Sequence, residues 1–392
     1  MRISFYAPLK SPDHPVPSGD RRMARLLITA LELAGHKIAL ASDFRSYEGT
    51  GDPLLQEAMF ATGRVEADHI VQTCLEQPAH NRPEVWFTYH QYYKAPDHLG
   101  PIVSSTLGIP YVVAEPSHAP KRAAGPWKMA HESVTASLEM TDCAFCLTQH
   151  DMTCVEPVLA SPDRLVYLPP FLDSEPFQHD RSQKNVARQH LSEAFNITAD
   201  LILIAVGMMR PGDKFDSYQR LAESLDQLDT LVDWQLLIVG DGDRGEQVRK
   251  LFTSRNKLTA RTLFAGEQPA SEVARMLSAA DICVWPAVGE AYGMALLEAQ
   301  ASALPVVAGN LRGVPDVVRD GETALLVPPE DPAAFAAAVK RLLEDQNLRQ
   351  RFGSRAALFV AEDRSLERAA DILNEGLNMA IENKADSRRT GA

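Results

Sequence analysis

The stretch ICVWPAVGEAYGMALLEAQASALPVVA (residues 282–308) contains one complete repeat unit of a parallel sheet. The apolar run 282–285 predicts a buried strand, and the run 306–308 predicts a second one. Between the two runs, Gly289 and Gly293 mark a loop that leads into a helical pattern. A strand, a helix and a further strand in this order form a βαβ unit, in which the two strands run parallel.

The same alternation runs through most of the chain. Short apolar runs rich in β-branched residues predict further strands at 3–7, 37–41, 85–89, 111–114, 143–147, 165–168, 201–206, 235–239, 262–265 and 324–327. Helical patterns lie between several of these runs, at 21–34, 217–227, 270–279 and 333–343. The runs show little alternation of apolar and polar residues, which is typical of parallel strands with helices on both faces. The sequence therefore predicts an α/β fold.

The predicted strands form two sets of about six, which together are too many for one comfortable open sheet. Pro169–Pro170 ends the first set, and a polar segment follows it. We therefore expect two doubly wound, Rossmann-like domains facing each other across a cleft, at 1–172 and 185–360, joined by a linker at 173–184. The remaining residues, 361–392, are expected to form a helix that packs on either domain, followed by a frayed tail after Lys384.

Composition and charge exclude several classes of protein. The chain has 39 Lys and Arg against 52 Asp and Glu, and its net charge of −13 argues against nucleic acid as the main partner. Five cysteines are too few for a disulfide framework. The opening MRISFYAPLK lacks the apolar run of a signal peptide, and no run of about 18 apolar residues predicts a membrane span. We therefore expect a cytoplasmic protein.

Two glutamates flank the glycine that opens the predicted helix after 282–285. The free N–H groups of a helix N-terminus bind anions, and Gly293 lets a phosphate approach the backbone closely. Glu298, about one turn into that helix, can accept hydrogen bonds from the vicinal hydroxyls of a ribose. Glu290 can hold a second polyhydroxyl group. Taken alone, the pair also fits a solvated Glu290 and a Glu298 that is favoured by the helix dipole.

The string E-A-Y-G-M-A-L-L-E (290–298), followed by P-V-V-A (305–308), resembles the E-x7-E signature of the retaining glycosyltransferases of family 4. Further segments resemble motifs of this family in the expected order: 168–173, 240–242, 263–266, 280–282, 320–321 and 325–328. The resemblance covers the C-terminal domain from end to end. It implies the two-domain GT-B fold and an enzyme that takes its sugar from a nucleotide-diphosphate-sugar.

The resemblance also implies roles for single residues. Glu298 is expected to bind the donor ribose and Glu290 the hydroxyls of the donor sugar, while the backbone amides of Gly293 and Met294 face the diphosphate. The expected donor-binding set is completed by Tyr292, Gly207 and Gly266.

Two cations are expected to clamp the diphosphate and to stabilise the negative charge that grows as the sugar leaves. The resemblance assigns these roles to Arg210 and Lys214, in the loop after 201–206. The match departs from the family here, because Met208 follows the loop glycine and Phe215 follows the lysine. Each cation also fits an ordinary solvated loop residue.

The N-terminal domain resembles the family less closely. The loop that contains Gly19 would approach the donor phosphates or the acceptor. After the strand 111–114 the family carries a histidine that contacts the donor sugar, and His118 is the nearest candidate, with His90 as its rival. Either histidine also fits a polar loop residue without such a role.

Two further clusters of side chains, one of cysteines and one of basic residues, are candidate binding sites. Cys143 and Cys146 superficially resemble a metal or redox site, but residues three apart on a strand point to opposite faces, so we expect buried thiols. Lys121, Arg122 and Lys128 cluster around Trp127 in a chain that is otherwise acidic. This basic patch suits anionic lipid headgroups, an anionic acceptor or plain solvation.

The sequence therefore predicts a retaining glycosyltransferase that uses neither a metal ion nor another cofactor. Its expected partners are a nucleotide-sugar donor and a carbohydrate or glycolipid acceptor, with peripheral contact to the inner face of a membrane as an option. Two alternatives stay open. Departures at Met208, Ser18 and Asp316 favour a nucleotide-sugar-binding partner or sensor that has lost catalysis, and a sugar-nucleotide epimerase could share the fold.

Overall fold

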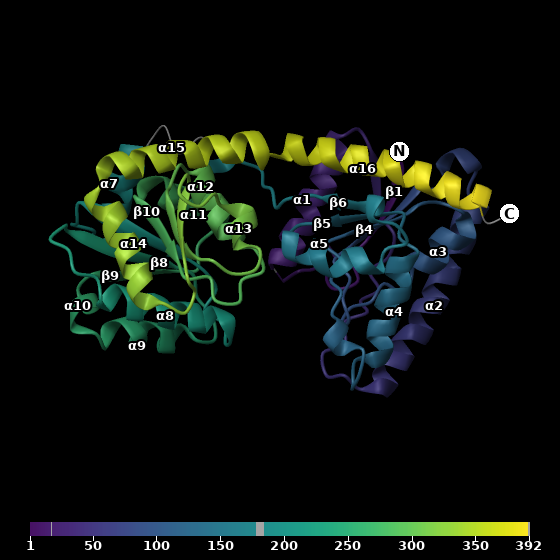
Figure 1. Cartoon of the computed structure of the whole chain (residues 1–392), viewed down its shortest axis with the longest axis horizontal. Coiled ribbons are helices and arrows are strands. Elements are labelled where there is room, and N and C mark those ends of the chain that lie inside the picture. The colour runs from purple at the N-terminus through teal and green to yellow at the C-terminus, as the bar shows by residue number, and fades with distance from the viewer. Residues whose placement is uncertain (17, 178–183, 391–392) are drawn as a thin grey trace. The chain divides into compact units, whose positions relative to one another are not determined.

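The computed structural model describes residues 1–16, 18–177 and 184–390. The chain divides into two compact units, each with its own parallel sheet (Figure 1). Unit 1 consists of Met1–Pro169 and Leu366–Ala392, and unit 2 consists of Pro170–Ser365.

The sheet of unit 1 has the order β2-β1-β3-β4-β5-β6, and all neighbours are parallel. Its strands are β1 (Arg2–Tyr6), β2 (Lys37–Leu40), β3 (Val85–Tyr89), β4 (Tyr111–Ala114), β5 (Cys143–Cys146) and β6 (Leu165–Tyr167). Every residue of β3, β4 and β5 is buried, which explains why these strands read as continuous apolar runs. The rings of Phe5, Phe87 and Phe145 stack across the sheet, with centroids 5.5 and 6.2 Å apart.

The helices of unit 1 are α1 (Gly19–Leu33), α2 (Pro53–Glu76), α3 (Gly100–Leu107), α4 (Lys128–Glu139), α5 (Gln149–Val155) and α16 (Leu366–Thr390). The helix α1 begins where it does because the Ser18 hydroxyl accepts a hydrogen bond from the Arg21 N–H. Met23, Leu27 and Leu31, at helical spacing, bury one face of α1.

The helix α16 belongs to unit 1, although it follows all of unit 2 along the chain. It packs beside α1 and β5, and a Cβ atom at Gly376 would lie only 2.3 Å from the ring of Phe145. The expectation of a frayed tail after Lys384 is wrong, because the helix continues to Thr390. Contacts hold this end in place: Lys384 lies 3.5 Å from Asp142, and Arg164 donates a hydrogen bond to Ser387.

The sheet of unit 2 has the order β12-β11-β10-β7-β8-β9, again parallel throughout. Its strands are β7 (Leu201–Val206), β8 (Trp234–Val239), β9 (Thr262–Gly266), β10 (Ile282–Trp285), β11 (Val306–Gly309) and β12 (Ala324–Val327). Taken from the β9 edge, the order is third, second, first, fourth, fifth and sixth, which is that of dinucleotide-binding folds.

The helices of unit 2 are α7 (Lys184–Phe195), α8 (Asp213–Asp226), α9 (Gly245–Thr253), α10 (Asn256–Thr259), α11 (Ala270–Ala279), α12 (Met294–Ala301), α13 (Val314–Val317), α14 (Pro332–Glu344) and α15 (Gln346–Asp363). They surround a single core to which all six strands contribute.

The predicted fold class is confirmed: both units are α/β layers built on parallel six-stranded sheets. We placed the end of the first domain at 172, whereas the compact units change over between Pro169 and Pro170. The expected linker 173–184 falls partly on 178–183, which lie outside the described residues. In the part of the chain that the structure describes, no helix is both long and apolar enough to cross a membrane.

Replacing Gly376 by leucine should separate α16 from β5, because the new side chain would occupy the position of the Phe145 ring. We expect a loss of about 1–3 kcal/mol in the free energy of unfolding, as for other overpacked cores. Chemical denaturation monitored by circular dichroism measures it. The matched control is Asn378→Leu at an exposed position on the same helix, and an equal loss in both variants would contradict this packing.

Candidate functional site

The neighbours β7 and β10 in unit 2 are the strands at which the order of the sheet reverses. In open α/β sheets, ligands bind outside the carboxyl ends of the strands at such a reversal. The loop after β7 runs from Gly207 to Gly212 into α8, and the loop after β10 runs from Pro286 to Gly293 into α12. The residues predicted to bind the donor lie mostly in these two loops.

The loop after β7 is fixed against the loop after β8 by backbone hydrogen bonds. The Met209 N–H donates to the Asp241 carbonyl at 2.9 Å, and the Arg244 N–H donates to the Met209 carbonyl at 2.8 Å. The approach requires glycine, because a Cβ at Gly240, where φ is +136°, would lie 1.9 Å from the Gly207 carbonyl oxygen. The first loop therefore has a defined backbone that carries Arg210 and leads into α8, where Lys214 lies.

An ion pair joins the first turn of α8 to the loop after β10. The Nζ atom of Lys214 lies 2.5 Å from Oε2 of Glu290, and the Trp285 indole N–H donates to the same oxygen at 3.2 Å. The Lys214 ammonium also lies 5.4 Å from the centre of the Trp285 ring. The side chains of Lys214 and Glu290 keep 33% and 15% of their exposure, so the pair borders solvent and remains open to a ligand.

The start of α12 has the backbone geometry of an anion site. Gly293 adopts φ +86°, which favours glycine, and it precedes the first turn without a side-chain cap. The N–H groups of this turn are therefore free of a capping side chain. Within the same helix, Glu298 is buried, with 6% of its surface exposed.

The structure brings some of the predicted residues together and keeps others apart. Lys214 meets Glu290, and Gly207 lies against Trp285, to which a Cβ at 207 would come within 3.0 Å. Arg210 is exposed in the loop before α8. Gly266 lies at the end of β9, where its carbonyl accepts from the Gly240 N–H. Tyr292 and Met294 are half-buried beside the core of unit 2.

In unit 1 the sheet order reverses between β1 and β3, and the predicted Gly19 and His90 follow these two strands. Gly19 is the exposed first residue of α1. Its neighbour Asp20 lies 3.1 Å from Nδ1 of His90. His90 adopts φ +58°, a left-handed conformation that non-glycine residues rarely take and that concentrates at functional sites.

The imidazole of His90 is held in its charged form. Burial disfavours that form, but the carboxylates of Glu115 and Asp20 outweigh burial and raise the pKa of His90 to about 9. Burial raises the pKa of Glu115 to about 7, against the opposing effect of His90. Near neutral pH, this end of unit 1 therefore combines a cationic imidazole with carboxyl groups able to accept hydrogen bonds from hydroxyls.

His118 is directed elsewhere. Its Nε2 lies 3.1 Å from the Thr135 hydroxyl on α4, and its ring packs on His131 with centroids 4.8 Å apart. Burial and the neighbouring His131 lower the pKa of His118. Of the two rival histidines, His90 lies with the Gly19 loop, whereas His118 packs against a helix.

Sequence reasoning missed three residues that shape these sites. Trp285 is the last residue of the strand before the predicted loop, and Asp20 directly follows Gly19. Both residues could therefore have been found by inspecting the ends of strands and the starts of helices. Glu115 depends on a left-handed backbone at φ +52°, for which a glutamate gives no sequence signal.

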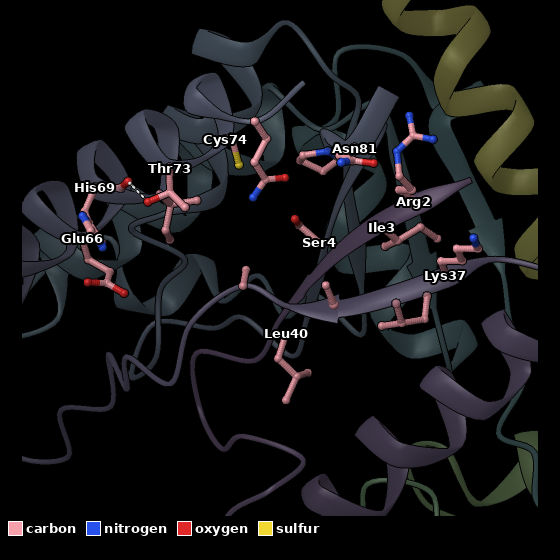
Figure 2. Close-up of a pocket in the computed structure, with 16 residues that line it drawn as sticks. Arg2, Ile3, Ser4, Lys37, Leu40, Glu66, His69, Thr73, Cys74 and Asn81 are labelled. Carbon is pink, nitrogen blue, oxygen red and sulfur yellow. Dashed lines mark hydrogen bonds between the residues drawn. The ribbon is translucent and has the colours of Figure 1, made fainter. Parts of the chain in front are cut away.

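A cavity of about 540 Å³ lies elsewhere in unit 1, between α2 and the strands β1 and β2 (Figure 2). Figure 2 shows Arg2 and Lys37 on its strand side and His69, Thr73 and Cys74 on its α2 side. None of the residues predicted for donor or acceptor binding lines it. We therefore assign it no part in the candidate site.

Comparison with known proteins defines the class. Residues 200–345, which span most of unit 2, match the family described as glycosyl transferases group 1. The chain thus carries a glycosyl transferases group 1 domain. Its two-domain architecture matches HepE of Anabaena, solved in complex with UDP, with a TM-score of 0.72 and 18% identity over 96% of this chain and 100% of that one. The fold is that of the GT-B glycosyltransferases.

Two curated relatives are more similar in sequence. Alpha-D-kanosaminyltransferase of Streptomyces kanamyceticus is 30% identical over 203 residues, which cover 52% of this chain and 51% of that protein. D-inositol 3-phosphate glycosyltransferase of Acidothermus cellulolyticus is 27% identical over 285 residues, or 69% and 62% of the two chains. The matched region thus spans between half and two thirds of the length of these relatives.

We expect the pKa of His90 to depend on Asp20. Because its folded pKa, about 9, exceeds its ordinary 6.5, the pairing stabilises the fold below pH 6.5, and this contribution is lost as the pH rises through about 9. Asp20→Asn should lower the pKa of His90 towards 6.5, as measured by NMR of the imidazole protons. Asp13→Asn, on an exposed carboxylate in the loop before α1, is the control. An unchanged His90 pKa in Asp20→Asn would contradict the pairing.

Proposed function

We propose that this protein is a glycosyltransferase that moves a sugar from a nucleotide-diphosphate-sugar to a hydroxyl of a carbohydrate or glycolipid acceptor. One observation carries the proposal: the Lys214–Glu290 pair lies beside the uncapped start of α12, at the reversal point of the sheet in a group 1 domain. A cation, free backbone N–H groups and carboxylates in one place suit a ligand with phosphates and hydroxyls.

In this proposal each group of unit 2 has one task. Glu298 accepts hydrogen bonds from the ribose, and the N–H groups of Gly293 and Met294 face the diphosphate. When the donor binds, the Lys214 ammonium turns from Glu290 to the diphosphate, and the Glu290 carboxylate becomes free to accept hydrogen bonds from the sugar. The exposed Arg210 joins Lys214 at the phosphates.

The chemistry we propose is a substitution with retention of configuration. The bond between the anomeric carbon and the diphosphate oxygen breaks, and its electron pair stays on the phosphate. The acceptor oxygen bonds to the anomeric carbon from the same face, and its proton passes to the departing phosphate oxygen. Lys214 and Arg210 lower the barrier because negative charge on the phosphate is greatest as the bond breaks.

Metal independence is part of the proposal and is open to a direct test. Asp241 and Asp243 form a D-x-D string after β8, the pattern that often holds a divalent ion at phosphates. Asp241, however, accepts a hydrogen bond from the Gly242 N–H. In the described residues no group of three His, Cys, Asp or Glu side chains is arranged to hold a metal ion. We expect turnover to survive EDTA.

The relatives support the donor class more than the acceptor. The HepE structure contains UDP, and the two curated relatives are named as transferases that act on different compounds. A second function is nucleotide-sugar binding without turnover. It is favoured by Met208, a residue at which the sequence departs from the family pattern and whose surface is 41% exposed. Measured turnover separates the two.

Turnover should depend on the charge of Glu290. We expect the purified protein to release nucleoside diphosphate from one of a panel of UDP-, GDP-, ADP- and dTDP-sugars, with Glu290→Gln lowering kcat/KM by about 10- to 100-fold, the effect of one charge-assisted hydrogen bond. The exposed Glu246→Gln on α9 is the matched control. Equal turnover in the two variants would remove Glu290 from the mechanism, and nucleotide binding without turnover in the parent would favour the second function.

A further inference from the structure

Three aromatic rings form a continuous row at the carboxyl ends of β3 and β4 in unit 1. Tyr92 and Tyr93 follow β3, and Trp127 precedes α4. The ring centroids of Tyr92 and Tyr93 are 5.4 Å apart, and those of Tyr93 and Trp127 are 5.1 Å apart. The row begins beside His90, whose ring lies 5.4 Å from that of Tyr92. We call Tyr92, Tyr93 and Trp127 the aromatic row.

Cations border the aromatic row. The guanidinium of Arg122 lies 4.9 Å from the centre of the Tyr93 ring, and the Lys94 ammonium lies 5.5 Å from the Trp127 ring. Neither cation has a carboxylate within 4.0 Å in the described part of the chain. Nε of Arg122 is buried without a hydrogen-bond partner among the same residues. Two cations on neighbouring rings, without a carboxylate partner among the described residues, are unexpected in a protein whose net charge is −13.

The loop after β2 is tied to the loop that carries the two tyrosines of the aromatic row. The Glu48 N–H donates to the Lys94 carbonyl at 2.8 Å, which ties this loop to the one after β3. In spite of its burial, the pKa of Glu48 is held low by hydrogen bonds from Thr50 and from the N–H of Gly51, at 2.6 Å for the latter. The Glu48 carboxylate is therefore occupied within its own loop, and among the described residues it forms no ion pair with Lys94 or Arg122.

The aromatic row thus has two chemically different ends. At the Tyr92 end lie His90 and the carboxylate of Asp20, groups that bind hydroxyls. Lys94 lies at the Trp127 end, and Arg122 lies at Tyr93 in the middle of the row; both are groups that bind anions. Burial raises the pKa of Tyr92, as do the neighbouring Tyr47 and Asp20.

We propose that the aromatic row and its cations form a binding site for a phosphorylated polyol or sugar, which is the acceptor. The apolar face of the ring packs on Tyr92 and Tyr93. The phosphate binds Arg122, whose planar fork matches phosphate oxygens, and Lys94. A hydroxyl at the opposite side of the ring lies towards the Asp20–His90 pair. The assignment of this ligand as acceptor rests on the proposed function, whereas its binding does not.

The phosphorylated polyol can be free in solution or be the headgroup of a lipid. The two sources share the same chemistry at Arg122 and Lys94, and they differ in whether binding needs a bilayer. A purely electrostatic contact with a membrane, in contrast, requires only negative surface charge and no polyol.

Isothermal titration with sugar phosphates tests the site. We expect glucose 6-phosphate or myo-inositol 1-phosphate to bind the full-length protein at least 10-fold more tightly than glucose or myo-inositol. Arg122→Gln should remove most of this preference. Arg64→Gln, which deletes the same charge from an exposed position on α2, is the control and should leave the preference intact.

Vesicle sedimentation extends the test to the lipid source. Binding to phosphatidylinositol in phosphatidylcholine vesicles, lost in Arg122→Gln, would assign the polyol phosphate to a headgroup. Equal binding to phosphatidylserine vesicles would overturn the proposal, because that headgroup is no polyol. The proposal also fails if no phosphate-bearing probe binds more tightly than its uncharged counterpart, or if Arg64→Gln weakens binding as much as Arg122→Gln.

The same variants separate this proposal from the proposed function. Arg122→Gln should retain the stabilisation of the protein by its nucleotide, because Arg122 belongs to unit 1 and the donor residues to unit 2. Sugar-phosphate binding without any nucleotide binding would leave the site standing and overturn the glycosyltransferase assignment. Nucleotide-sugar turnover without sugar-phosphate binding would do the reverse.

Discussion

The ion pair between Lys214 and Glu290 is the interaction on which the candidate donor site depends. It joins the start of α8, which follows β7, to the loop after β10, and β7 and β10 are the two strands between which the order of the sheet reverses. Both loops are shaped by glycines: Gly240 permits the approach of the β8 loop to Gly207, and Gly293 opens α12 in a left-handed conformation. Without a ligand, the ammonium of Lys214 and the carboxylate of Glu290 neutralise each other at a position that is partly exposed to solvent. In the function that we propose, the diphosphate becomes the partner of Lys214 and the sugar becomes the partner of Glu290.

The two units place different sets of side chains on one kind of architecture. In unit 2, the reversal point gathers a lysine, a glutamate and an uncapped helix start. In unit 1, it gathers Asp20 and a charged His90, with an aromatic and cationic surface beyond them. The parallel sheet brings the loops together in both cases, and the residues that those loops carry decide what is bound.

Much of the fold and part of the site follow from the sequence. Buried parallel strands leave continuous apolar runs, so the strands of both sheets were predictable, as was the loop with Glu290 between β10 and α12. The unit on which α16 packs was not predictable, because amphipathic periodicity indicates that a helix buries one face but does not indicate which element covers that face. The direction of His118 was also hidden: the loop after β4 turns it to Thr135 on α4, and distance along the chain does not reveal that turn.

The most direct measurement is the melting temperature of the purified protein with UDP, GDP, ADP and dTDP. Our account predicts that one nucleotide stabilises the fold by about 2.7 kcal/mol at about 100 times its dissociation constant. Lys214→Gln should reduce this stabilisation, because the ammonium no longer reaches the diphosphate, whereas Lys340→Gln on α14 should not. A folded sample that none of the four nucleotides stabilises would contradict the donor site at β7 and β10.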